Sequence, residues 1–232
     1  MAAYFDMAAD LNNNHHHPLS PHSKIMTDSS SFYTYKPIDL STDAIRVLRL
    51  RRGYNTDPIS CELIEIFLQD DGVPYEALSY TWGDSEVDVD VLINKRKRPV
   101  RDNLYTALHC LRRASEDRLL WVDSLCINQA DDREKTHQVG RMRRIYEKAD
   151  RVLIWLGRAT TDIDLLMELM SQLRKRARRR KSYQKEDLTA WLEEWPILME
   201  ELGGMDTDFN TRRRNALLDI LNRPWFQRVW IL

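Results

Sequence analysis

The sequence is poor in cysteine and glycine, and each shortage excludes a class of site. Its three cysteines, Cys61, Cys110 and Cys126, include no CxxC pair, which argues against a disulfide framework and against a cysteine-based zinc site. Its seven glycines build neither the GxGxxG of dinucleotide-binding folds nor the GxxxxGKS or GxxxxGKT of a P-loop. The HExxH and GxSxG motifs of common zinc and serine hydrolases are missing as well.

An excess of one charge and a long apolar run are also missing. The chain carries 35 Lys and Arg against 36 Asp and Glu, so the overall balance gives no reason to expect binding to nucleic acid or to an anionic membrane. No apolar run approaches the ~18 residues of a membrane span, and the first residues do not resemble a secretion signal. We therefore expect a cytoplasmic protein, with the nucleus as the alternative.

The chain divides by composition into a polar beginning and one large domain. Residues 1–32 are rich in Asn, His, Ser and Pro without an apolar period, which predicts a disordered leader. The histidines in this stretch are explained by a short solvated tract, and we assign no metal site. Residues 33–74 are expected to form a β segment that leads into a domain at residues 75–232.

Six short segments have the composition of strands, and one of them, around Val89 and Val91, alternates strictly as a half-buried strand does. The expected strands are residues 44–50, 59–68, 77–80, 87–93, 119–122 and 151–157. Apolar residues at helical spacing predict one helix after Asp102, taken as its N-cap, and another after Asp131, where D-x-x-E approximates a capping box.

From residue 77 onward, strands and helices alternate and the strands are almost continuously apolar. This pattern predicts an α/β fold with a mostly parallel sheet flanked by helices, in a flavodoxin-like arrangement with extra N-terminal strands. Three C-terminal helices are expected at residues 163–173, 188–195 and 212–221, with Pro224 opening a further helical turn.

Ligands of open parallel sheets bind beyond the carboxyl ends of the strands, so the residues after each expected strand are the candidate site. These residues are Ser79, Tyr80, Thr81, Trp82, Gly83, Asp84, Asp123, Ser124, Cys126, Asn128, Gln129, Gly157 and Arg158. If the strands adjoin, these groups line one rim.

Each of these residues also has an ordinary structural explanation. Asp123 could orient a ribose or act as an acid or base, but an aspartate at a strand end commonly caps the next turn. Trp82 could be a stacking platform or a core aromatic at a tight turn. Cys126 fits a small core residue better than a nucleophile, because the sequence around it shows nothing that would lower its pKa.

Long composite motifs carry a family resemblance. YEALSYTWGD at residues 75–84 and LWVDSLCINQ at residues 120–129, followed by RVLIWLG and NRPWFQRVW, resemble in order and spacing the successive blocks of the fungal heterokaryon incompatibility (HET) domain. The residues that carry the resemblance are Tyr80, Trp82, Gly83, Trp121, Asp123, Cys126, Asn128, Gln129, Trp155, Gly157, Trp225 and Trp230.

The resemblance implies an effector of fungal non-self recognition that triggers programmed cell death. It also implies protein partners, either a second copy or an upstream recognition protein. The HET domain is considered a distant relative of the Toll/interleukin-1 receptor (TIR) domain, some members of which cleave NAD. NAD is therefore the implied candidate substrate, with Asp123, Asp84 and Glu76 as candidate catalytic carboxylates.

In the HET family the last block runs on into a Gln-Glu pair and a further helix, whereas this sequence stops at Leu232. We therefore expect a domain that is incomplete at its C-terminus and has no enzymatic activity. The alternative is a non-catalytic protein-interaction module.

The run RKRARRRK at residues 174–181 is the most basic part of the chain. It suits nuclear targeting or a solvated helix face. No aromatic-rich or zinc-finger context supports nucleic-acid binding.

Overall fold

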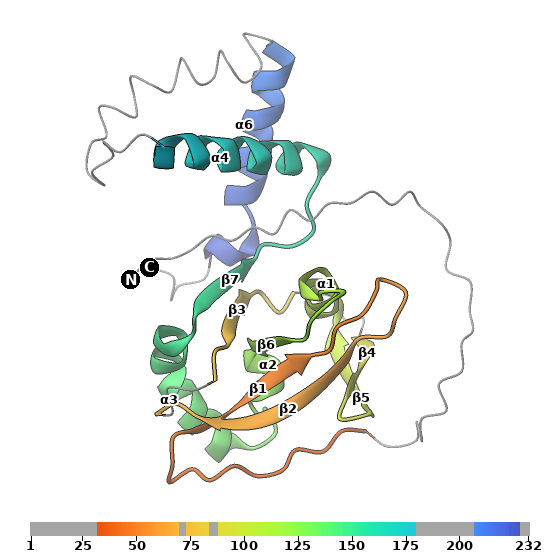
Figure 1. Ribbon diagram of the computed structural model, residues 1–232, viewed down its shortest axis with the longest axis vertical. Helices are drawn as coiled ribbons and strands as arrows, with labels where there is room; N and C mark the ends of the chain where they lie inside the picture. Colours follow the sequence, from red (N-terminus) through yellow and green to blue (C-terminus); the bar gives the residue numbers. More distant parts are fainter. Residues whose placement is uncertain (1–31, 70–72, 84–87, 180–206, 228–232) are drawn as a thin grey trace. The chain divides into compact units, whose positions relative to one another are not determined.

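The computed structural model describes residues 32–69, 73–83, 88–179 and 207–227, which fall into two compact units. The first unit ends at Gly157 and contains a seven-stranded sheet with helices (Figure 1). The second unit begins at Arg158 and is helical. Within the described part of the chain, no helix combines the length and apolar character needed to cross a bilayer.

The strands of the first unit are β1 (Ala44–Leu50), β2 (Ser60–Phe67), β3 (Glu76–Tyr80), β4 (Asp88–Ile93), β5 (Arg96–Arg101), β6 (Arg118–Trp121) and β7 (Arg151–Trp155). Its helices are α1 (Asp102–Leu111), the single turn α2 (Asp123–Cys126) and α3 (Asp132–Lys148). The second unit contains α4 (Thr161–Arg179), α6 (Thr207–Leu221) and the 3₁₀ turn η1 (Pro224–Gln227).

The strand order in the sheet is β5-β4-β2-β1-β6-β3-β7. Three of the six neighbouring pairs are parallel, namely β2–β4, β6–β3 and β3–β7, and the other three are antiparallel. The α/β class is therefore confirmed, but the expectation of a mostly parallel sheet is wrong because the sheet is mixed. Strand–helix alternation constrains only the strands joined through helices, whereas short connections such as that between β4 and β5 permit antiparallel pairing.

The three adjacent parallel strands predicted from the sequence are confirmed, and they form one end of the sheet. Strand β3 lies between β6 and β7 and runs parallel to both, with Ala77 opposite Trp121 and Tyr80 opposite Trp155. All five residues of β3 are buried. The carboxyl ends of these three strands therefore lie at the same edge of the sheet.

Strand β5 was not predicted. It forms a hairpin with β4 through Asn94 and Lys95, whose φ angles are 50° and 67°. Two consecutive left-handed residues suit the two-residue turn of a hairpin, and asparagine tolerates this conformation. The alternation expected for β4 is confirmed, since Val91 is buried between exposed Asp90 and half-buried Leu92.

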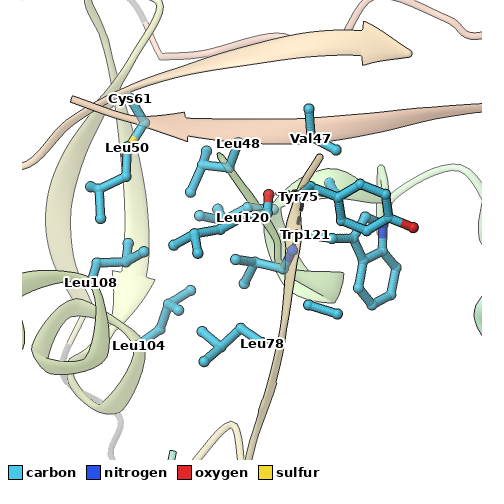
Figure 2. Close-up of a cluster of buried hydrophobic side chains, with 14 of the residues drawn as sticks. Val47, Leu48, Leu50, Cys61, Tyr75, Leu78, Leu104, Leu108, Leu120 and Trp121 are labelled. Carbon is cyan, nitrogen blue, oxygen red and sulfur yellow. Dashed lines mark hydrogen bonds between the residues drawn. The ribbon is translucent and has the colours of Figure 1, made fainter. Parts of the chain in front are cut away.

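The core of the first unit is built by the strands and α1. Figure 2 shows Leu104 and Leu108 of α1 pointing toward the side chains of the strands, and both leucines are buried as expected. Trp121 is fully buried and packs edge-on against Tyr146 of α3, with ring centroids 5.5 Å apart.

The two predicted helix starts have different outcomes. Helix α1 begins at Asp102 itself, so Arg101 rather than Asp102 is its N-cap. Asp131 caps α3 as expected, since its side chain accepts hydrogen bonds from the backbone N–H groups of Arg133 and Glu134. The carboxylate of Glu134, in contrast, points to Arg46.

The second unit pairs α4 with α6. Its apolar cluster contains Ile163, Leu166, Leu169 and Ala216, and Arg212 forms an ion pair with Asp162. The helices expected near residues 163–173 and 212–221 are thus confirmed, and Pro224 opens η1. The helix expected at residues 188–195, most of the leader, and the side chains of the basic run at residues 174–181 lie outside what the structure describes.

Candidate functional site

An aromatic ring and a carboxylate meet at the carboxyl ends of β3 and β6. Trp82 follows β3 by two residues and is 41% exposed, and its Nε1 donates a hydrogen bond to Oδ2 of Asp123 over 3.2 Å. Asp123 opens α2, and its Oδ1 accepts from the backbone N–H of Ser124 at 2.7 Å. Gly83 takes a φ of +77° directly after Trp82, a conformation in which glycine is unstrained.

Asn103 joins the ends of β3 and β7. Its Oδ1 accepts a hydrogen bond from Nε1 of Trp155 at 2.9 Å, and its Nδ2 donates to the carbonyl of Thr81 at 2.6 Å. Arg101 reaches the same turn and donates to the carbonyl of Gly83. No sequence pattern indicated these two roles, because a polar residue at the start of a helix is ordinary.

Tyr80 and Ser124 form the inner part of the same edge. The Tyr80 hydroxyl and Ser124 Oγ lie 2.6 Å apart, and Gln129 Nε2 donates to the backbone carbonyl of Asp123 at 3.1 Å. Residues from the end of β3 and from the segment after β6 are thereby tied together. We call this set, with Trp82, Asp123, Asn103 and Trp155, the rim.

A cavity of about 200 Å³ opens beside the rim. Its lining includes Tyr80, Trp82, Ser124 and Gln129, together with residues of β5 and α1. Its volume is below the roughly 300–1,000 Å³ of pockets that enclose drug-sized ligands. The cavity therefore has room for a small group rather than for a whole dinucleotide.

The profile of the family described as Heterokaryon incompatibility protein (HET) matches residues 75–232, which include every rim residue. The chain belongs to the HET family.

Two curated fungal proteins show the extent of the similarity. Heterokaryon incompatibility protein 6, OR allele, of Neurospora crassa is 29% identical over 233 aligned positions, which cover 88% of this chain and 34% of that protein. Vegetative incompatibility protein HET-E-1 of Podospora anserina is 32% identical over 92 positions, covering 38% of this chain and 7% of that protein. The chain thus spans about a third of the first relative and much less of the second. No solved structure matches the chain.

Several HET motif residues stabilise the fold rather than face the rim. Cys126 is buried, and burial raises the pKa of its thiol to about 12, so it is protonated at neutral pH and is a poor nucleophile. The backbone N–H of Asn128 donates to Glu134 Oε1 at 2.7 Å. Trp121 lies in the core.

Glu134 forms a buried ion pair with an arginine that lies outside the matched region. Arg46 of β1 donates to both of its oxygens, at 2.6 and 3.0 Å, and also to the carbonyl of Cys126 at 3.2 Å. The side chains of Arg46 and Glu134 are only 5% and 3% exposed. The bidentate pairing and the additional carbonyl acceptor supply the buried Arg46 guanidinium with hydrogen-bond partners. A buried pair without such partners would leave its donors unsatisfied.

The carboxylate Glu76 lies at the opposite end of β3 from the rim. Tyr80 stands four positions further along the extended strand, a distance of roughly 13 Å. Its oxygens are bound by Arg118 Nε and Nη2 and by Arg151 Nε, the last at 3.0 Å. Glu76 is therefore not brought together with Asp123.

The remaining candidates are placed as follows. Asp84 and Trp230 lie outside the described residues, and Gly157 closes the first unit with a φ of +102°. Trp225 is buried in the second unit, where it packs edge-on against Phe226. Among the described residues, no group of three or more His, Cys, Asp or Glu side chains could hold a metal ion.

Proposed function

We propose that this HET chain is an effector domain of fungal vegetative incompatibility, and that its rim binds the ligand through which it triggers growth arrest and cell death. One observation carries the proposal. Residues of separate HET motifs, Trp82, Asp123 and Trp155, converge at the carboxyl ends of three adjacent parallel strands, beside a cavity. The carboxyl edge of parallel strands is where ligands of such sheets bind.

The rim is better suited to binding than to chemistry. Trp82 offers an exposed aromatic face, which favours stacking on a planar group. The oxygens of Asp123 already accept hydrogen bonds from Trp82 and from the backbone of Ser124. A carboxylate held in this way orients its neighbours, whereas a catalytic base needs to contact the reacting atoms.

We further propose that a protein partner activates the domain, either a second copy of the chain or an upstream recognition protein, and that this takes place in the cytoplasm. Supporting this view, the Neurospora relative is about three times as long as the region aligned with this chain. We also propose a TIR-like relationship for the parallel strands β6-β3-β7, because their site lies beyond the strand ends.

Inducible expression in a filamentous fungus tests the proposal, with hyphal growth and membrane integrity as measurements. The wild-type chain should arrest growth, and Trp82→Ala should abolish the arrest while the protein accumulates normally. Tyr54→Ala is the matched control, because Tyr54 is an aromatic residue 71% exposed and does not line the cavity. Continued growth with the wild-type chain contradicts the effector role, and full arrest by Trp82→Ala contradicts the role of the rim.

An enzymatic alternative remains for the same site. If the domain cleaves NAD, Asp123 is the described rim carboxylate that could face the ribose, since Glu76 lies at the far end of β3. NAD consumption by the purified chain separates this alternative from ligand binding alone.

A further inference from the structure

Two arginines of β5 line the cavity beside the rim. Arg98 and Arg101 both contribute to its lining, together with Trp82 and Ser124. Arg101 uses one of its five N–H groups on the carbonyl of Gly83. Two guanidinium groups in the lining of one cavity favour an anion there, because hydrogen bonds from a charged donor to an oxyanion are about twice as strong as neutral ones.

Arg98 is held in place by an aromatic ring. Its guanidinium lies over the ring of Tyr35, 5.3 Å from the centroid, and Arg46 lies over the same ring at 5.1 Å. The Tyr35 hydroxyl donates a hydrogen bond to the carbonyl of Leu125 at 2.9 Å, which fixes the ring. Burial raises the pKa of Tyr35 to about 12, so the ring stays neutral and does not pair with Arg98 as a phenolate. The arginine is thus preorganised without losing its charge.

The charges and the size of the cavity define the ligand. Asp88 is the one acidic residue among the described residues of the lining; it is exposed and stands opposite Arg101 in the β4–β5 register, and these two described residues form no ion pair. Two cations therefore face one solvated carboxylate. A volume of about 200 Å³ corresponds to the space of roughly six or seven waters, at about 30 Å³ each, so the ligand must be compact.

We propose that this cavity binds the oxyanion group of a small phosphate ester or carboxylic acid, with Arg98 and Arg101 as its anion-binding pair and Trp82 against the organic part. The planar guanidinium fork matches the geometry of both oxyanions. This proposal rests on the proposed function in one respect, since it identifies the chemistry of the ligand that the rim binds.

Calorimetric titration of the purified full chain tests the proposal, using phenyl phosphate and benzoate as probes. At least one of them should bind saturably, and the stronger of the two identifies the class of oxyanion. Arg98→Gln and Arg101→Gln should each weaken binding about tenfold or more, because each removes a charge-assisted hydrogen bond. Arg133→Gln is the matched control: it removes the same charge from an exposed position at the start of α3 and should leave binding unchanged.

Failure of both probes to bind overturns the proposal, as does unchanged binding by both cavity variants or equal weakening by Arg133→Gln. Thermal unfolding of each variant shows whether it is folded. If Arg98→Gln is unfolded, Arg101→Gln still tests the proposal. Binding is measured without cells, so it separates this proposal from the effector role. A wild-type chain that binds a probe but does not arrest growth contradicts only the effector role.

Discussion

A carboxylate lies at each end of β3, and the two are in opposite circumstances. At the amino end, Glu76 is buried and bound by two arginines. At the carboxyl end, Asp123 meets an exposed tryptophan beside a cavity. The first end is saturated with internal partners and has no capacity left for a ligand. The second end keeps aromatic surface and cationic side chains open to solvent, which is where binding is expected.

The largest expected effect comes from the saturated end. Glu76→Ala should lower the free energy of unfolding by about 3–5 kcal/mol, because it leaves the buried Arg118 guanidinium without its counter-ion. Denaturant titration measures the change. Glu62→Ala is the control, since Glu62 also bridges two arginines but is 38% exposed, and its loss should cost no more than about 1 kcal/mol. Equal losses in the two variants would remove the contrast between buried and solvated pairs.

A smaller effect is expected at the open end. Trp155→Ala should lower the free energy of unfolding by about 2–3 kcal/mol, because Trp155 is half-buried and its Nε1 donates to Asn103. The loss should be somewhat smaller than for truncation of a fully buried tryptophan. Asp123→Ala should cost about 1 kcal/mol, the value of exposed hydrogen bonds, and yet abolish growth arrest. If its melting temperature falls as far as that of Trp155→Ala, Asp123 has a structural role.

Gly83→Arg should also abolish growth arrest. The φ of +77° strains any residue with a Cβ, and the new Cβ would lie 3.4 Å from that of Asn103. We expect a loss of about 1–2 kcal/mol in stability, measured by thermal unfolding. Gly140→Ala is the control, because a Cβ at Gly140 meets nothing within 4 Å. A Gly83→Arg variant as stable and as active as Gly140→Ala would show that the turn tolerates a left-handed side chain.

Thiol reactivity tests whether the core of the first unit is closed to solvent. Burial raises the pKa of both Cys61 and Cys126 to about 12, so both stay protonated at pH 8, where only a thiolate would react. Iodoacetamide at pH 8 should therefore alkylate the exposed Cys110 first, as followed by mass spectrometry. Rapid alkylation of Cys126 without denaturant would mean that the core opens readily.

The smallest expected effect is none at all. We expect no NAD turnover by the purified chain, because the oxygens of Asp123 and Glu76 are engaged by neighbouring donors. Loss of nicotinamide from NAD, followed by chromatography, is the measurement. Turnover that Asp123→Asn abolishes would make the open end a catalytic site.

The sequence predicted the parallel strands β6, β3 and β7 and most residues of the rim, because both depend on local patterns. Apolar strands separated by helices fix β3, β6 and β7, and the motif residues Tyr80, Trp82 and Asp123 follow directly from the strand ends. It did not predict the sheet order, because the pairing of β1 with β6 depends on contacts such as Leu48 with Leu120 across distant parts of the chain.

The polar partners were missed for a similar reason. Arg98 and Arg101 belong to a strand whose charged sequence looks like a solvated loop, and Glu134 looked like a capping residue. The actual partner of Glu134 is Arg46, which is 88 positions away, and no periodic pattern points to it.

The position of β1 determines where this chain can be cut. The HET profile begins at Tyr75, yet β1 and β2 stand between β4 and β6 in the sheet. A recombinant fragment that starts at Tyr75 would lose two inner strands, expose two new strand edges and leave Glu134 buried without a cation. Open edges of this kind pair with other copies, so such a fragment should precipitate. Expression for structural work should therefore start upstream of the segment that contains Tyr33 and Tyr35.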